Sequence, residues 1–145
     1  MDMVILNIDQ VSKQWDYIRE GILNSIYPIV VPTLENLRSI LSQLLMSDMQ
    51  CWCILNEDRE CYGYVITSLN RDINTKEKTL VIYSVYLNKM LPDSETWRKF
   101  DSILNEYAKR TECVRIVQYS ANPNAISIAK KLGFTEYSFL VKEVS

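Results

Sequence analysis

Cysteine thiols are the most reactive side chains of this chain, which has four cysteines and no histidine among its 145 residues. Cys51, Cys53 and Cys61 lie in or beside a predicted hairpin, and Cys113 begins a later strand. Such thiolates could bind a metal ion or pair as disulfides. Because Cys51 and Cys53 alternate along one strand and no C-x2-C spacing occurs, we expect no metal site and instead buried free thiols in a reducing compartment.

Proton transfer would depend on other groups, because no imidazole is present. Three carboxylates of the predicted hairpin turn, Glu57, Asp58 and Glu60, are the candidates for a general base. The same residue types are ordinary in turns, so their presence alone does not indicate catalysis.

The apolar periodicity predicts a single α/β domain over residues 1–145 that would position these groups, in the order β-α-α-β-β-β-α-β-α-β. Strands are predicted at 4–8, 51–55, 61–69, 80–87 and 113–119, with a last strand running from 134 to 144. Helices are predicted at 11–26, 33–44, 93–109 and 122–132. We expect one mixed sheet with helices on both faces, because the third helix can cross back to a strand parallel to the fourth.

Charge and hydropathy exclude several kinds of partner. The net charge is -2 and the pI is near 5.2, so no excess of basic residues is present for a phosphate-binding face, and we do not expect a nucleic acid partner. No apolar run reaches the roughly 20 residues of a membrane span, and the N-terminus lacks the basic flank of a signal peptide. We therefore expect a cytoplasmic protein that is neither secreted nor bound to a membrane.

The last third of the chain contains a recognisable motif. Asn122, Ala125, Lys131, Gly133 and Phe134 fit the pattern N-x-x-A-x-x-x-Y-x-K-x-G-F, and Gly63-Tyr64-Val65-Ile66 provides a glycine-bearing third strand. Together with the order of the elements, these residues resemble the GNAT family of N-acetyltransferases over nearly the whole chain. Each match also has a structural explanation, since Gly133 suits a helix C-cap and Asn122 a helix start.

The resemblance implies acetyl-CoA as co-substrate and a small-molecule amine as acceptor. It places the pantetheine arm of acetyl-CoA between the fourth and fifth strands, along the main chain of Val85, Tyr86 and Leu87. Lys89 and Asn122 are the further residues that it implies would contact the cofactor.

One part of the family's machinery, the phosphate loop, is degraded. The family pattern R/Q-x-x-G-x-G/A corresponds to residues 88–97, which contain no glycine. Pro92 removes an N–H donor from this loop. Asp93 and Glu95 add negative charge at the start of the following helix, where they would repel a pyrophosphate.

A second part, the general acid, is also missing. The tyrosine that the family uses to protonate the departing thiolate falls on Ala129, and alanine cannot transfer a proton. Tyr119, at the end of the fifth strand, and Tyr137, after the Gly133-Phe134 stop, are the tyrosines that could replace it.

Three functions are consistent with these residues. The first is a pseudoenzyme, a GNAT-fold module that binds or assembles without catalysis. Trp97-Arg98-Lys99-Phe100 is similar to the same region of short GNAT-like bacteriophage virion proteins, so the protein would be located in a virion instead of the cytoplasm. Its partner would be a virion component or a second copy, bound through an apolar or aromatic patch drawn from Trp15, Trp52, Trp97 and the tyrosines. The second is an active acetyl-CoA-dependent N-acetyltransferase with an atypical loop, and the third is an unrelated α/β binding domain.

Overall fold

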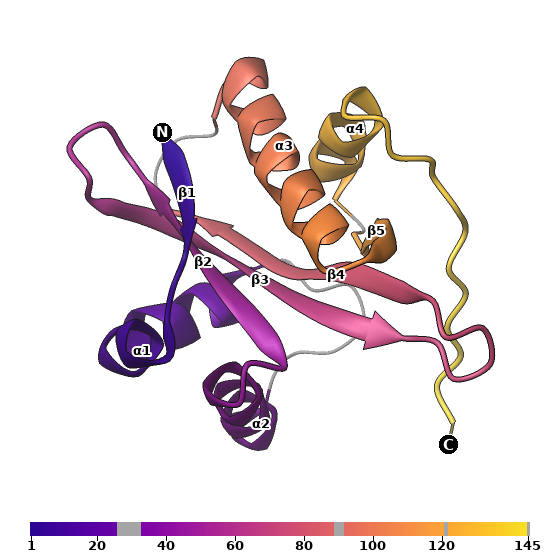
Figure 1. Cartoon of the computed structure of the whole chain (residues 1–145), viewed down its shortest axis with the longest axis horizontal. Helices are drawn as coiled ribbons and strands as arrows, with labels where there is room; N and C mark the ends of the chain where they lie inside the picture. The colour runs from indigo at the N-terminus through magenta and orange to yellow at the C-terminus, as the bar shows by residue number, and fades with distance from the viewer. Residues whose placement is uncertain (26–32, 89–91, 121, 145) are drawn as a thin grey trace.

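The computed structural model describes residues 1–25, 33–88, 92–120 and 122–144, which form a sheet with helices on both faces (Figure 1). The strands are β1 (Asp2–Ile5), β2 (Met49–Leu55), β3 (Cys61–Arg71), β4 (Lys78–Leu87) and β5 (Cys113–Gln118). The helices are α1 (Ile8–Asn24), α2 (Leu34–Leu45), α3 (Ser94–Arg110) and α4 (Pro123–Lys131). Within these four segments, no helix has the length and apolar character needed to cross a lipid bilayer.

The sheet has the spatial order β1-β2-β3-β4-β5. β1 to β4 pair antiparallel, and β5 joins β4 in parallel after the α3 crossover. A parallel neighbour needs such a crossover because the chain must return to the same end of the sheet before the next strand begins. α1 and α2 lie against one face, and α3 and α4 lie on the other (Figure 1). The predicted mixed α/β sheet is confirmed.

Local signals define the ends of two helices. The Thr33 hydroxyl accepts the N–H of Asn36 at 3.2 Å, and the Asn36 side chain accepts the N–H of Thr33 at 3.0 Å, which forms a capping box. Asn122 caps α4, with Pro123 in its first turn. Gly133 follows α4 with a φ of 96°, a left-handed conformation that favours glycine. These predicted starts and the predicted glycine stop are confirmed.

Two clusters of buried side chains, one on each face of the sheet, hold the helices in place. The first contains Val11, Ile18, Ile22, Leu37, Ile40, Leu44, Met49, Cys51, Cys53, Tyr64 and Ile66. The second contains Met3, Trp52, Ile54, Val65, Leu80, Ile82, Phe100, Leu104 and Ala108. Trp52 is only 3% exposed, and its Nε1–H donates to Thr67 Oγ1 at 3.0 Å. The prediction that Trp52 could belong to an exposed contact surface is therefore wrong, because helix α3 packs over it.

The predicted last strand does not form. Residues 134–144, which we call the tail, have no strand assignment and join no sheet. Tyr137, Leu140 and Val144 of the tail are largely exposed. Alternating apolar residues are typical of a strand, but a strand also needs a neighbour whose main chain pairs with its own. The prediction is wrong because the residue pattern contains no information about that neighbour.

Candidate functional site

Strand β5 stays paired with β4 up to its own last residue and ends midway along β4. Their parallel pairing begins at Lys78 and Cys113 and ends at Ile82 and Gln118. β4 continues to Leu87, whereas β5 ends at Gln118 and the chain proceeds to α4. Beyond Ile82, β4 therefore has β3 on one side and, among the described residues, no paired strand on the other, and we call this unpaired edge the strand gap. It lies where the resemblance to the GNAT family places the pantetheine arm.

A β-bulge at Tyr83 marks the start of the strand gap. In the ladder between β3 and β4, Ile66 pairs with Ser84 whereas Thr67 pairs with Ile82, so Tyr83 is the extra residue. A bulge bends its strand and increases the local twist. The bend lies one residue beyond the last pair between β4 and β5.

Alternation along β4 determines which main-chain groups face the strand gap. The N–H of Asn88 donates to the carbonyl of Tyr62 at 2.9 Å, which makes them a hydrogen-bonded pair of the ladder. Hydrogen-bonded and non-hydrogen-bonded pairs alternate between antiparallel strands, so Tyr86 belongs to the same set as Asn88. Val85 and Leu87 then direct their N–H and C=O groups away from β3. Of the three β4 residues predicted to contact the cofactor, these two face the gap.

Gly63 allows β3 to approach this half of β4 closely. A Cβ at Gly63 would lie 2.1 Å from the carbonyl oxygen of Tyr86 and 3.1 Å from the Cα of Leu87. No side chain fits at such distances, so glycine is required for the ladder itself. The glycine of the predicted third strand is therefore explained by the close packing of β3 against β4.

The N-terminus of α3 is capped by a carboxylate. Asp93 is the N-cap, and its Oδ1 accepts the N–H of Thr96 at 2.8 Å. This hydrogen bond holds the pKa of Asp93 below its usual value, so the side chain is negative at neutral pH. A phosphate at this helix end would lose the Thr96 donor and meet a like charge. Lys89, the predicted cation of this loop, lies outside the described residues.

The remaining predicted site residues have different surroundings. Tyr119 directly follows β5, next to the closed end of the strand gap, and its ring centroid is 5.2 Å from that of Phe139. Tyr137 lies on the tail and is exposed. The Asn122 side chain accepts two main-chain amides of the first turn of α4, so its acceptor oxygen is already used. Tyr119 is thus a partly exposed side chain whose ring contacts the tail, Tyr137 is a solvent-facing side chain, and a catalytic role for either stays a prediction.

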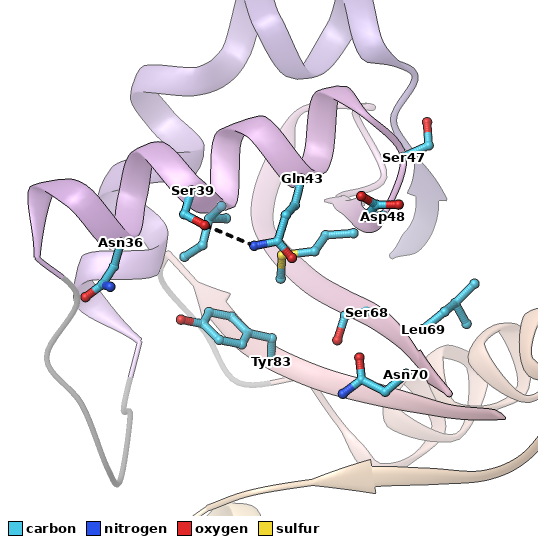
Figure 2. A pocket seen from close by; sticks show the side chains of 11 residues that line it. Asn36, Ser39, Gln43, Ser47, Asp48, Ser68, Leu69, Asn70 and Tyr83 are labelled. Atoms are coloured by element: carbon cyan, nitrogen blue, oxygen red, sulfur yellow. Dashed lines mark hydrogen bonds between the residues drawn. The ribbon is translucent and has the colours of Figure 1, made fainter. Parts of the chain in front are cut away.

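A groove of about 770 Å³, which we call the polar groove, lies between α2 and the β3-β4 pair and includes Tyr83 in its lining (Figure 2). Figure 2 shows the Tyr83 ring pointing from β4 toward α2, below Ser39 and Gln43. Gln43 Nε2 donates to Ser39 Oγ at 3.3 Å across this helix face. The polar residues of the groove are Asn36, Ser39, Gln43, Ser47, Asp48, Ser68 and Asn70. Amides, hydroxyls and one carboxylate can accept hydrogen bonds from an amine or a polyol.

Neither Tyr83 nor the polar groove was found by sequence reasoning. A partial signal exists, because Asn36, Ser39 and Gln43 recur at spacings of three and four and form a polar stripe on α2. The bulge at Tyr83 has no comparable signal, because an extra residue in a strand is defined only by the pairing register.

The candidate general bases are ordinary turn residues in the structure. Glu57, Asp58 and Glu60 are exposed in the turn between β2 and β3. The Asn56 side chain organises this turn by accepting the N–H of Glu60 at 2.9 Å. None of the three carboxylates is among the described residues that line the polar groove.

The cysteines are all free thiols, but they differ in exposure. Cys51 and Cys53 are buried as predicted, whereas Cys61 is exposed and Cys113 is half-buried. The prediction of burial is wrong for Cys61 because it begins β3 directly after an exposed turn. In the part of the chain that the structure describes, no group of three or more Cys, Asp or Glu side chains could hold a metal ion.

No protein-family model and no curated protein sequence matches this chain. Solved structures do match it, over nearly all of both chains. Glucosamine-6-phosphate N-acetyltransferase from Arabidopsis thaliana aligns with a TM-score of 0.66 at 13% identity, covering 99% of this chain and 97% of that one. An aminoglycoside acetyltransferase from an uncultured soil metagenomic sample aligns with a TM-score of 0.71 at 14% identity, with 99% and 97% covered.

A third match was solved with a ligand that joins both substrates. AAC(6')-Iy, in complex with the bisubstrate analogue CoA-S-monomethyl-acetylneamine, aligns with a TM-score of 0.71 at 12% identity, covering 99% of this chain and 97% of that one. These matches show that the chain has the fold of the GNAT acetyltransferases, which confirms the predicted fold. At such identities they show the fold alone. The resemblance to bacteriophage virion proteins stays a prediction.

Proposed function

We propose that this chain is a GNAT-fold binding module for pantetheine thioesters, which holds the pantetheine arm along β4 and does not dock a pyrophosphate at α3. The observation that carries this proposal is the strand gap, which opens after the pairing of Ile82 with Gln118. A pantetheine arm contains amide groups in an extended chain, so it can add to the open edge of a strand. Val85 and Leu87 supply the main-chain donors and acceptors for it.

The negative charge at the N-terminus of α3 supports the proposal that no pyrophosphate docks there. A helix N-terminus binds an anion through unpaired N–H groups and its positive dipole. Here Asp93 accepts the Thr96 N–H and carries a negative charge of its own, and Glu95 adds another acidic residue in the first turn. The nucleotide end of coenzyme A therefore gains little from this loop, and the pantetheine arm contributes most of the affinity.

The test compares acetyl-CoA with S-acetylpantetheine, which lacks the nucleotide and the pyrophosphate. We expect the two dissociation constants, measured by isothermal titration calorimetry, to agree within about threefold, which is less than 1 kcal/mol. In amide NMR spectra, the Val85 and Leu87 signals should shift on binding, while the Tyr86 signal, which belongs to the set that faces β3, serves as the internal control. If neither compound binds, the proposal is wrong.

A charge-removing variant tests the α3 end separately. Asn is as good an N-cap as Asp, so Asp93→Asn should keep the helix start while removing the negative charge. We expect the variant to bind acetyl-CoA several-fold more tightly and S-acetylpantetheine unchanged. A wild-type protein that prefers acetyl-CoA by more than tenfold, about 1.4 kcal/mol, would contradict the absence of a pyrophosphate site.

A second candidate function is acetyl transfer to an amine, and the polar groove is the observation that favours it. The groove reaches β4 at Tyr83, one residue beyond the last pairing with β5. An amine in the groove would lie beside a thioester at the closed end of the strand gap, and positioning alone can accelerate such a reaction. Release of free thiol from acetyl-CoA in the presence of small amines tests it. If Tyr119 is the acid, Tyr119→Phe should slow thiol release and Tyr137→Phe should not.

The protein partner predicted from the sequence, a second copy or an assembly component, belongs to the same proposal. It would make the chain a module that combines a bound thioester with an interaction surface. The solution mass gives a first test, because a mass above the 17.0 kDa of one chain would support self-association.

A further inference from the structure

Two thiols approach each other outside the strand gap and the polar groove. Cys53 lies in β2 and Cys61 begins β3, and their Sγ atoms are 2.8 Å apart. Both are free thiols. A disulfide bond is about 2.05 Å long, so the two sulfurs are less than an ångström from bonding distance.

A second β-bulge brings these two side chains onto one face of the sheet. Ile54 pairs with Gly63 but Leu55 pairs with Cys61, so Tyr62 is an extra residue in β3. In a regular ladder Tyr62 would pair with Leu55, and Cys61 would point to the opposite face, because side chains alternate along a strand. With it, Cys61 lies on the same face as Leu55, and therefore on the same face as Cys53.

The two thiols differ in exposure and in chemistry. Cys53 is 3% exposed, whereas Cys61 is open to solvent beside the turn. The Cys53 S–H donates to Cys61 Sγ, and this hydrogen bond outweighs the opposing effect of burial and lowers the pKa of Cys61 to about 6, with smaller contributions from Tyr64 and the Gly63 main chain. Donation to Cys61 and burial raise the pKa of Cys53. Cys61 is thus an accessible thiolate, and Cys53 is a protonated neighbour in contact with it.

We propose that Cys61 and Cys53 form a modification site at which a hydroperoxide oxidises the exposed thiol and the buried thiol closes an intramolecular disulfide between β3 and β2. In the first step the Cys61 thiolate attacks the peroxide ROOH, the O–O bond breaks, and Cys61 sulfenic acid and RO⁻ form. In the second step Cys53 sulfur displaces the sulfenic oxygen, which leaves as water with the thiol proton and the sulfenic proton. The two thiols lose two electrons in total, and the peroxide gains them.

Cys61 differs from the other cysteines in its exposure, its pKa and its contact with a second sulfur. A structural thiol is buried and unreactive, as Cys51 is, with a pKa that burial raises. Cys113 is half-buried and lies 3.5 Å from the Thr111 hydroxyl, with no second thiol beside it in the part of the chain that is described. Cys61 combines exposure, a lowered pKa and a partner sulfur in contact, so it should react first.

The test uses the reduced full-length chain, treated with hydrogen peroxide and then with an alkylating agent that blocks the remaining thiols. Trypsin cleaves after Arg38, Arg59 and Arg71, so the disulfide appears as peptides 39–59 and 60–71 joined with the loss of two hydrogens. Because peptide 39–59 carries both Cys51 and Cys53, fragment-ion spectra that locate the alkylated thiol identify which of the two is joined to Cys61. We expect the pair joined through Cys61 and Cys53 to form at least about tenfold faster than any oxidation of Cys113. Reduction with dithiothreitol should restore the original mass.

Variants at the exposed position and at a control position sharpen the result. Cys61→Ser should abolish the joined peptides and leave the fold intact, because Cys61 is at the surface. Cys113→Ser should leave the joined peptides unchanged. The proposal is overturned if the wild-type chain, under peroxide that oxidises Cys113, forms no bond between Cys61 and Cys53, or if Cys61 joins Cys51 instead. The proposal does not depend on thioester binding, so the two can fail separately.

Discussion

Strands β2 and β3, which we call the layer, differ from the segment that runs from α4 through the tail in how much of their apolar surface is covered. Ile54 and Ile66 are 0% exposed, whereas α4 has no buried residue and Leu140 of the tail is 92% exposed. Both regions are apolar in sequence. β2 and β3 have a strand on each side and helices on both faces, while the tail joins no strand. Folding stability should therefore be concentrated in the layer and nearly absent from the tail.

The largest effect is expected from adding one methyl group to a glycine of the layer. At Gly63 a Cβ would lie 2.1 Å from the Tyr86 carbonyl oxygen, so Gly63→Ala must push β3 and β4 apart. We expect a loss of about 3 kcal/mol or more in the free energy of unfolding, measured by urea denaturation. Gly133→Ala is the matched control, because its Cβ meets nothing within 4 Å and only its φ of 96° is unfavourable. That variant should lose about 1–2 kcal/mol, and a larger loss there than at Gly63 would contradict the comparison.

Truncating a large apolar side chain in each region gives the next effect. Ile54→Ala leaves a cavity in a closed cluster and should cost about 2–5 kcal/mol. Leu140→Ala removes a side chain that is 92% exposed and should change stability by less than about 0.5 kcal/mol. Urea denaturation of both variants measures the contrast. Equal losses would mean that the tail is covered in solution, and the comparison would be wrong.

A pH-dependent effect is expected at the start of α3. The hydrogen bond from the Thr96 N–H lowers the pKa of Asp93 in the folded state, so this carboxylate contributes stability above the pKa of the unfolded chain. That contribution is lost as the pH falls through the folded pKa. Compared with Asp93→Asn, whose cap does not titrate, the wild type should lose melting temperature between about pH 5 and pH 3. A difference between the two melting curves that stays constant over this range would rule out the role of the charge.

Deleting residues 137–145 should have the smallest effect. The deletion keeps the ion pair between Lys130 and Glu136 and removes the ring contact between Tyr119 and Phe139. An aromatic pair contributes about 0.5–1.5 kcal/mol, so the melting temperature should fall by only a few degrees. Phe139→Leu, which removes the same ring contact in a full-length chain, is the control and should account for most of the change. Unfolding of the truncated protein would show that the tail is part of the core.

Much of the fold could be predicted from the sequence because its signals are local. The helix start at Thr33, the Asn122 cap and the Gly133 stop depend on residues within a few positions of one another, and all three form as predicted. The reciprocal hydrogen bonds between Thr33 and Asn36 were not predicted. The apolar stripes of α1, α2 and α3 are also local patterns, and they are covered in the two clusters. The absence of glycine from residues 88–97 needs no structure to be seen.

Tertiary structure alone decided the features that depend on pairing across strands. The extra residue Tyr83 lies at the start of the strand gap, the extra residue Tyr62 brings Cys61 onto Cys53, and each is defined only by the register of a neighbouring strand. The tail carries a strand pattern and still forms no strand, because no strand of the described segments pairs with it. Residue type sets what a segment can form by itself, and long-range pairing sets which of those possibilities is realised.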